Sequence, residues 1–437
     1  MDLSRKQDIA IIGGGVGGCC TALELAKTGK YQVQILEKNS ELMKESSDAT
    51  PGRMGLGFHY ADQNTAIYYL HATLDFTKRF GNFRQEIDKG NSHPLRRGRY
   101  FIMKNSLIPT ESILKTYDAL KAEYIRIVLQ DKTYQLFGPP DEFYRILEPH
   151  EYQNDVVEAD VEIGIETAEE LLNWKQFRLY LINELQKHEN RITINLNTEV
   201  TGIRAVNKSG YSIQSESQSG YQIATSADVV VNASWYNISK FNKMLGVTDV
   251  KSCNRVKAIA MVLLPIELVD ASSMFFCMGS FCMFSNKGDG VGMITYASET
   301  NVAVSSSNDF EGDMADIYFN VSDHDKRAKG QRIINGVSKF IPKMKNAQLV
   351  KTYYGVIQTI IDKDANDHGF VIGNLDFLHD PETGGIYKRD YSGVRVLRSG
   401  YIVNACMKLL YCIQNAERVR KIIDEMKQNN VLAIELI

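Results

Sequence analysis

The amino-acid sequence predicts an α/β protein with a doubly wound domain and a second domain built on a mixed or antiparallel β-sheet. Three observations lead to this fold class. A glycine-rich turn, G-x-G-x-x-G, joins an apolar strand to a helix near the N-terminus. Residues 227–234 form an apolar run ending in small side chains, which is typical of a parallel strand buried on both faces. Residues 254–355 alternate apolar and polar side chains between turn glycines, as antiparallel strands do.

The glycine-rich turn has the spacing of a dinucleotide-binding loop. Gly13 permits the tight turn, Gly15 lets the backbone approach a pyrophosphate closely, and Gly18 lets the helix pack against the strand. The helix N-terminus then presents free N–H groups to the phosphates. Glu37 follows Gly18 by nineteen residues, at the end of a second apolar run, and is expected to accept hydrogen bonds from both hydroxyls of an adenosine ribose. The alternative is an ordinary βαβ unit whose glycines serve only packing.

Apolar periodicity and turn residues predict the remaining elements in chain order. Helices are expected over 64–88, from Thr110 onward with Thr110 as the N-cap, over 174–187, near 325–340 and over 415–428. Strands are expected over 99–103, 192–196 and 199–205, with a hairpin through Ser209 and Gly210. Because 437 residues are many for one domain, we divide the chain into a discontinuous nucleotide-binding domain and a substrate-binding domain. The first comprises residues 1–94, 151–250 and 356–437, and the second comprises residues 95–150 and 251–355.

Composition and charge argue against several classes of function. The chain has 50 Lys and Arg against 53 Asp and Glu, a net charge of −3, so no nucleic-acid partner is expected. Its eight histidines and seven cysteines lack the spacing of metal ligands, and no metal is expected. The odd cysteine count indicates free thiols in a reducing compartment. No apolar run approaches the roughly 18 residues of a membrane span, and the N-terminus leads directly into the first strand without room for a signal peptide, so we predict a cytoplasmic protein.

Several segments match the motifs of one known family. They are the turn and acid at 13–37, the strands 199–203 and 228–234, the return segments 351–355 and 367–373, and the turn 407–411. In this order, along nearly the whole chain, they resemble the D-amino acid oxidase-like FAD-dependent oxidoreductases. That superfamily includes glycerol-3-phosphate dehydrogenases, L-2-hydroxyglutarate oxidases and sarcosine oxidases. The chain departs from the family pattern in several places: Ser234 and Trp235 replace a final glycine, the segment 367–373 lacks a proline, Gly55 replaces a histidine, and His59 replaces a tyrosine.

The resemblance implies bound FAD in a Rossmann-like domain of the glutathione reductase type. The cofactor-binding residues that it implies are Gly13, Gly15, Gly17, Gly18, Glu37, Lys38, Gly52, Val200, Ala233, Ser234, Lys408, Leu409 and Leu410. The turn that begins at Lys408 precedes the final helix, and its backbone N–H groups are expected to stabilise negative charge on the reduced flavin. An ordinary helix start with an exposed lysine is the alternative.

Four positions are candidates for contact with the substrate. An imidazole titrates near neutrality, so His59 suits a base that removes a proton from an alcohol or ammonium group. Arg53 and Lys408 can bind a carboxylate or phosphate. Tyr353 or its neighbour Tyr354 is expected to face the active site, because adjacent side chains of a strand point to opposite faces. A structural role for His59 and a surface position for Arg53 are the alternatives.

These observations together predict an FAD-dependent oxidoreductase. Its expected reaction is the oxidation of a small anionic amine, amino acid or 2-hydroxy compound by hydride transfer to flavin N5. The sequence favours neither oxygen nor a quinone as the electron acceptor. A binding or regulatory protein on the same fold, without turnover, is the alternative function.

Overall fold

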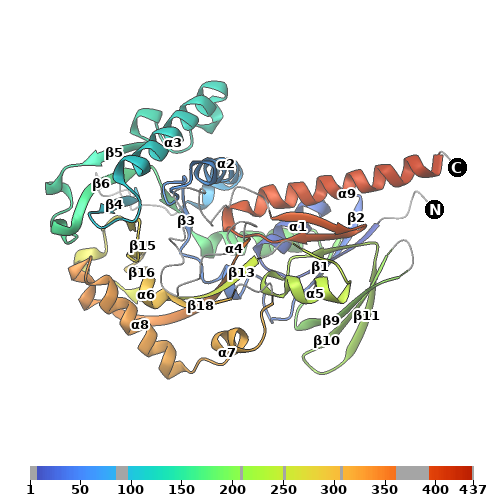
Figure 1. Cartoon of the computed structure of the whole chain (residues 1–437). Coiled ribbons are helices and arrows are strands. Elements are labelled where there is room, and N and C mark those ends of the chain that lie inside the picture. Colours follow the sequence, from blue (N-terminus) through green and yellow to red (C-terminus); the bar gives the residue numbers. More distant parts are fainter. Residues whose placement is uncertain are drawn as a thin grey trace.

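The computed structural model describes residues 7–84, 97–206, 210–249, 252–305, 309–360 and 393–435 (Figure 1). Two β-sheets dominate the view: one lies with helices α1 and α9 near the termini, and the other lies with α3 and α8 at the opposite side. The predicted segment 367–373 and Ser209 of the predicted hairpin lie outside the described residues.

The first sheet has six strands in the order β19-β20-β12-β1-β2-β8. They are β1 (Gln7–Ile12), β2 (Tyr31–Leu36), β8 (Ile192–Asn195), β12 (Val229–Asn232), β19 (Val394–Arg398) and β20 (Tyr401–Asn404). All neighbours are parallel except β19 and β20. Strand β12 is buried along its whole length, because both faces of the sheet are covered. The doubly wound part of the predicted fold class is therefore confirmed.

Alternate residues of β1 fill two different cores. Ile9 and Ile11 pack on the helical side of the sheet, whereas Ala10 and Ile12 pack against a small antiparallel sheet on the other side. The helices are α1 (Val16–Lys27), α4 (Trp174–Lys187) and α9 (Cys412–Glu435), and the small sheet is made of β9 (Thr198–Ala205), β10 (Tyr211–Ser217) and β11 (Gln222–Ala227). Two-sided burial explains why β1 reads as a continuous apolar run instead of an alternating one.

The second sheet has nine strands, in the order β17-β13-β16-β15-β14-β4-β6-β5, with β18 also paired to β13. They are β4 (Arg99–Met103), β5 (Tyr144–Leu147), β6 (Val161–Thr167), β13 (Ser252–Leu263), β14 (Met274–Cys277), β15 (Cys282–Gly288), β16 (Val291–Tyr296), β17 (Asn301–Ser305) and β18 (Gln348–Ile360). Every pair is antiparallel except β14 with β4, so the sheet is mixed, as predicted.

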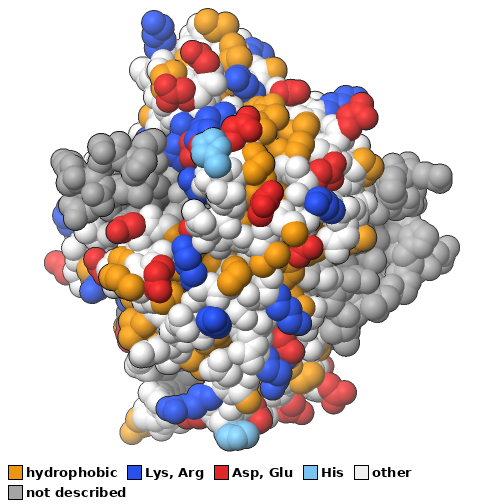
Figure 2. Space-filling view, turned by 90° about the vertical axis from the view of Figure 1, so that its left-hand side faces the viewer, with side chains coloured by type: hydrophobic (Ala, Val, Ile, Leu, Met, Phe, Trp, Pro, Cys, Tyr) orange, Lys and Arg blue, Asp and Glu red, His pale blue; other side chains and the backbone are white. Residues whose placement is uncertain are grey.

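The remaining helices and a short strand pair complete the two lobes. They are α2 (Gln63–Phe80), α3 (Thr110–Gln130), α5 (Ile238–Met244), α6 (Ala297–Thr300), α7 (Asp313–Phe319), α8 (Asp323–Val337) and the two-stranded pair β3 (Arg53–Met54) with β7 (Glu170–Leu171). Helix α8 packs against β13, β16 and β18. On the face that this lobe presents in Figure 2, Lys and Arg side chains are interspersed with Asp and Glu.

Some boundaries differ from the sequence prediction. Helix α2 ends at Phe80 and not at residue 88, because Gly81 caps it. Thr110 is the first residue of α3, and Pro109 occupies the capping position. Strand β6 belongs to the second sheet, through antiparallel pairing with β4, although its residues fall within the range 151–250 assigned to the nucleotide-binding domain. The predicted strand 99–103 and helix 174–187 match β4 and α4 residue for residue.

Within the described part of the chain, no helix is both long enough and apolar enough to cross a membrane.

Candidate active site

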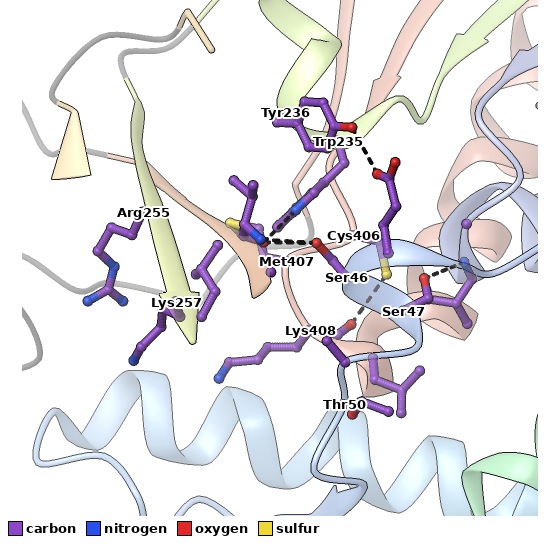
Figure 3. Close-up of a pocket in the computed structure, with 18 of the residues that line it drawn as sticks. Ser46, Ser47, Thr50, Trp235, Tyr236, Arg255, Lys257, Cys406, Met407 and Lys408 are labelled. Carbon is purple, nitrogen blue, oxygen red and sulfur yellow. Dashed lines mark hydrogen bonds between the residues drawn. The ribbon is translucent and has the colours of Figure 1, made fainter. Parts of the chain in front are cut away.

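One cavity of about 520 Å³ is lined by elements of both large sheets. From the first lobe its wall includes the glycine turn, the end of β2, the following loop and the segments 198–200, 233–237 and 406–409. From the second lobe it includes residues of β13, β14 and β15 and the segments 295–300 and 355–357. Figure 3 shows side chains from both lobes converging on this space.

Each glycine of the turn is suited to its position for a different structural reason. Gly13 has a φ of +106°, and a Cβ there would lie 2.6 Å from the carbonyl oxygen of Ala233. A Cβ at Gly18 would lie 2.1 Å from the carbonyl oxygen of Gly13, so close contact between helix and strand excludes any side chain. A Cβ at Gly15 would meet nothing closer than Ser47 Oγ at 3.5 Å, and Gly15 lines the cavity. The protein itself therefore leaves the space at Gly15 open, which fits a closely approaching pyrophosphate.

Glu37 is fixed at the cavity wall by backbone donors. Its side chain accepts hydrogen bonds from Gly14 N at 2.7 Å, from Asn39 N at 2.8 Å and from Asn39 Nδ2 at 2.7 Å. The residue is only 7% exposed. A carboxylate has about four acceptor positions, so three donors leave capacity for a ligand hydroxyl.

A compact polar cluster surrounds Lys38 next to this acid. Lys38 Nζ donates to Tyr236 Oη at 2.6 Å and lies 2.8 Å from Glu45, while Tyr236 Oη donates to Glu45 at 2.9 Å. Burial, followed by the charge of Glu45, raises the pKa of Tyr236 far above its ordinary value, so the phenol stays protonated. All three side chains line the cavity.

The segment that follows β12 shows how Ser234 and Trp235 are accommodated where the family pattern has a glycine. Ala233 and Ser234 line the cavity, and Ser234 Oγ donates to Asn232 Oδ1 at 2.6 Å. Trp235 has a φ of +58°, a left-handed conformation that favours glycine. Its indole Nε1 donates to the carbonyl oxygen of Val356 at 2.7 Å, so a contact with β18 accompanies this backbone conformation.

His59 and Lys408 lie at the other end of the cavity. The His59 ring makes an edge-on contact with Phe275 of β14, with centroids 4.5 Å apart. Lys408 Nζ lies 5.7 Å from the ring centre of Tyr60 and 5.8 Å from that of Tyr69. Both His59 and Lys408 line the cavity, so the structure brings together two side chains that are 349 residues apart in the sequence.

Most of the predicted cofactor-binding residues share this cavity. Those that line it are Gly13, Gly15, Gly17, Glu37, Lys38, Val200, Ala233, Ser234, Lys408 and Leu409. Gly18, Gly52 and Leu410 do not line it. Leu410 is 1% exposed and belongs to the core beneath the glycine turn, so its side chain cannot reach a ligand there.

Arg53 occupies a different place from the one predicted. Its guanidinium lies 2.6 Å from Glu169 and donates to Tyr100 Oη at 2.5 Å, and Arg53 does not line the cavity. Although burial alone lowers the pKa of Arg53, Tyr100 and Glu169 raise it above its ordinary value. Glu169 also accepts from Leu56 N at 2.7 Å, so the ion pair ties down the loop that leads to His59.

The register of β18 shows on which face of the sheet each of its two tyrosines lies. Tyr354 is paired with Ala258 and packs against the core of the second lobe. Tyr353 is paired with Ile259, on the cavity side of the sheet, but Tyr353 itself is not a lining residue. Its hydroxyl lies 4.0 Å from Met261 Sδ.

Two cations of the cavity wall were not predicted from the sequence. Arg255 and Lys257 both line the cavity, as does Ile259 two residues further along β13. The sequence did contain a signal for them, because charged and apolar residues alternate along this part of β13. The intervening Val256 and Ala258 are fully buried on the opposite face. No group of three or more His, Cys, Asp or Glu side chains within the described ranges is placed to hold a metal ion.

The fold and this cavity fit a dinucleotide-binding protein, and a family model gives the family. The model of the FAD dependent oxidoreductases matches residues 8–407. The chain belongs to this family. FAD as the cofactor and an oxidoreductase as the class of enzyme, both predicted from the sequence, are confirmed by this membership.

Solved structures with this fold cover nearly the whole chain. Glycine oxidase from Geobacillus kaustophilus superposes with a TM-score of 0.62 at 16% identity, covering 97% of this chain and 95% of its own. L-α-glycerophosphate oxidase from Mycoplasma pneumoniae, solved with FAD bound, gives 0.60 at 17% identity, covering 94% and 93%. L-proline dehydrogenase from P. horikoshii gives 0.59 at 14% identity, covering 97% and 94%. No match was found among curated protein sequences.

Proposed function

We propose that this oxidoreductase oxidises a small anionic amine, amino acid or 2-hydroxy compound. One observation carries the proposal: a single cavity joins the glycine turn and Glu37 to a region walled by His59 and Lys408. The similar structures include two enzymes named for amino acids and one named for a glycerol phosphate, and all three compounds are small anions or zwitterions.

The residues of the first lobe fit the cofactor. The open turn at Gly15 and the N-terminus of α1 would receive the pyrophosphate, and Glu37 would accept the ribose hydroxyls. The backbone at Lys408 and Leu409 would face the flavin ring. Bound FAD supplies an acceptor for hydride from a C–H bond next to nitrogen or oxygen.

The residues at the other end would handle the substrate. Lys408 attracts its negative charge, and His59 accepts the proton that leaves the substrate N–H or O–H group. Phe275 contacts the edge of the His59 ring and also lies 5.1 Å from the Arg53 guanidinium. We therefore assign Arg53 a positioning role, through its loop and Phe275, in place of direct substrate binding.

The domain division and the cytoplasmic location are parts of the same proposal. Cys19, Cys20, Cys277, Cys282, Cys406 and Cys412 are free, which supports a reducing compartment. The discontinuous first sheet, built from strands near residues 10, 195, 230 and 400, supports the proposed division of the chain, except that β6 joins the second sheet.

The proposal is tested by a visible spectrum followed by a substrate screen. The purified protein should show flavin absorbance or take up added FAD. Under anaerobic conditions the absorbance should bleach with at least one amino acid, N-methyl amino acid, 2-hydroxy acid or glycerol phosphate. His59→Gln should keep the flavin and slow bleaching by about 100-fold or more. A flavin-loaded protein that no member of the four classes reduces would support the regulatory alternative.

A further inference from the structure

One row of side chains crosses the face of the second sheet that lines the cavity. Phe275 of β14 is paired directly with Met283 of β15, and Met283 is paired directly with Thr295 of β16. Ile259 follows on β13, beside the residues that pair this strand with β16. Directly opposed residues share a face of a sheet, and all four of these side chains line the cavity. We call Phe275, Met283, Thr295 and Ile259 the apolar row, because three of them are hydrocarbon or thioether side chains and the threonine adds a methyl group.

The two faces of these strands are covered differently. On the face away from the cavity, Ala258, Ala260, Phe284 and Ile294 are fully buried in the core of the second lobe. On the cavity face, every member of the apolar row is only half-buried. Neighbouring strands lie about 4.8 Å apart, so the row presents apolar surface to the cavity over roughly 14 Å. Apolar surface that faces water is unfavourable in proportion to its area, and an apolar group of a ligand removes this contact with water.

Further apolar side chains extend this wall. Leu107, Ile108, Met278 and Phe281 also line the cavity. The backbone N–H of Leu107 donates to the carbonyl oxygen of Met278 at 2.7 Å, so the loop after β4 and the end of β14 lie against each other. Leu107 is 57% exposed, which places the outer edge of this wall at the protein surface. The apolar wall therefore reaches from the interior of the sheet to the solvent, and it offers contact area for a side chain of several carbon atoms.

The apolar row lies next to the groups assigned to the reaction. The His59 ring contacts Phe275, at one end of the row, with centroids 4.5 Å apart. In Figure 3, the strand that carries Lys257 lies across the space from the segment that carries Lys408. Lys257 is on the same face of β13 as Ile259, but it lies about 7 Å further along the strand, away from Phe275. A substrate held between His59 and Lys408 therefore meets apolar side chains on the side of the sheet.

We propose that the substrate is an amino acid or 2-hydroxy acid with a bulky apolar side chain, aliphatic or aromatic, which packs against the apolar row. This inference rests on the proposed function, in which Lys408 attracts the anionic group and His59 accepts the proton. An apolar side chain fits this wall because it replaces water over half-buried Phe, Met and Ile side chains. Met283 adds adaptability, since an unbranched thioether side chain follows different ligand shapes. Glycine and glycerol phosphate leave the row in contact with water, so they are expected to be the poorer substrates.

The test uses the FAD-loaded protein and carboxylates that lack the amine or hydroxyl group required for the reaction. Acetate, 3-methylbutyrate, 3-phenylpropionate and succinate are each titrated while the flavin spectrum is recorded. At least one of the two apolar acids should bind about tenfold or more tightly than acetate, because each buried methylene group contributes up to about fourfold in affinity. Succinate, whose added carbon atoms end in a charge, should bind about as weakly as acetate. Anaerobic reduction of the flavin should likewise be about tenfold or more faster with leucine, phenylalanine or their 2-hydroxy counterparts than with glycine or glycolate.

Two variants of the same type separate this subsite from general effects on the sheet. Met283→Gln keeps the length of the side chain and makes it polar, so it should weaken binding of the tighter apolar acid about fivefold or more and acetate binding less than about twofold. Met261→Gln is the matched control. Met261 is a half-buried methionine on the same face of the sheet, two residues beyond Ile259, but it does not line the cavity. This variant should leave the affinities for all four carboxylates unchanged.

Three results would overturn the inference. The first is equal affinity of the wild-type protein for acetate and both apolar acids, which is the result expected if the flavin ring itself covers the apolar row. The second is that Met283→Gln and Met261→Gln change the four affinities alike. The third is fastest reduction by glycine or glycolate. An FAD-loaded protein that gives any of these results contradicts the apolar subsite alone, whereas a protein that takes up no FAD, or that none of the four substrate classes reduces, contradicts the proposed function.

Discussion

The two ends of the cavity are built in different ways. At the glycine-turn end, the polar groups are held by residues of the first lobe: Glu37 by Gly14 and Asn39, and Lys38 by Glu45 and Tyr236. At the other end, His59, Lys408 and the β13 cations come from segments hundreds of residues apart. The first end is thus organised within one lobe, whereas the second depends on how the two lobes are assembled. A change at one end should therefore leave the other end largely intact.

The largest effect is expected from the ion pair that supports the second end. Arg53→Met leaves Glu169, whose side chain is 2% exposed, as a buried carboxylate without its cation. Breaking a buried pair in this way costs about 3–5 kcal/mol of unfolding free energy, measured by chemical denaturation. FAD affinity of the folded fraction should change less than about threefold, because the glycine-turn end is separate.

A double variant provides the control for this prediction. Arg53→Met combined with Glu169→Gln removes both charges and should recover more than half of the lost stability, since no unpaired charge remains. A single variant that loses less than about 1 kcal/mol would show that the pair does not support the loop.

The second-largest effect is expected from a substitution that disrupts only the glycine-turn end of the cavity. Gly15→Val places a branched side chain in the space that the protein leaves open, and should weaken FAD binding by roughly 100-fold or more, about 2.7 kcal/mol, in a fluorescence titration. The melting temperature of the apoprotein should change little, because no protein atom lies within 3.5 Å of the new Cβ. Gly18→Ala is the contrasting variant: its Cβ meets the backbone of Gly13, so it should destabilise the apoprotein as well. Equal apoprotein stability of the two variants would contradict these separate roles.

The smallest effect concerns a buried lysine at the junction between the ends. Lys287 of β15 donates to the carbonyl oxygen of Pro51 at 3.1 Å, and burial lowers its pKa to about 8. Below pH 8 the lysine is charged in both the folded and the unfolded chain, so the full cost of burying the cation is present. Between about pH 8 and 10.5 the unfolded chain binds more protons, and this cost disappears as the pH rises.

Lys287→Met should therefore stabilise the protein by about 2 kcal/mol at pH 7, after allowance for the lost hydrogen bond. Urea denaturation at several pH values measures the difference, which should shrink toward pH 10. A difference that stays constant with pH would contradict a lowered pKa for Lys287.

The same contrast explains what could be predicted from the sequence. The glycine turn, Glu37 and the strand 99–103 could be predicted because the spacing and periodicity that indicate them involve residues near one another in the sequence. The sheet that β6 joins was misassigned because its pairing with β4 follows a connection of some sixty residues. Arg53 was placed in the pocket from its loop alone, whereas its partner Glu169 lies 116 residues away.

The missed residues of the site have the same physical origin. Arg255 and Lys257 stand in a strand whose alternate residues are buried in the core, so the pattern predicts a strand without saying what its other face meets.

Trp235 has a further consequence for how small molecules enter. Its indole, on the loop after β12, is hydrogen-bonded to β18 of the other lobe, and Ser46 Oγ donates to the same carbonyl oxygen of Val356 at 3.2 Å. These two hydrogen bonds to one carbonyl group oppose a hinge motion between the lobes. Small molecules should then enter and leave the cavity by rotation of individual side chains at its opening, while the two sheets keep their relative position.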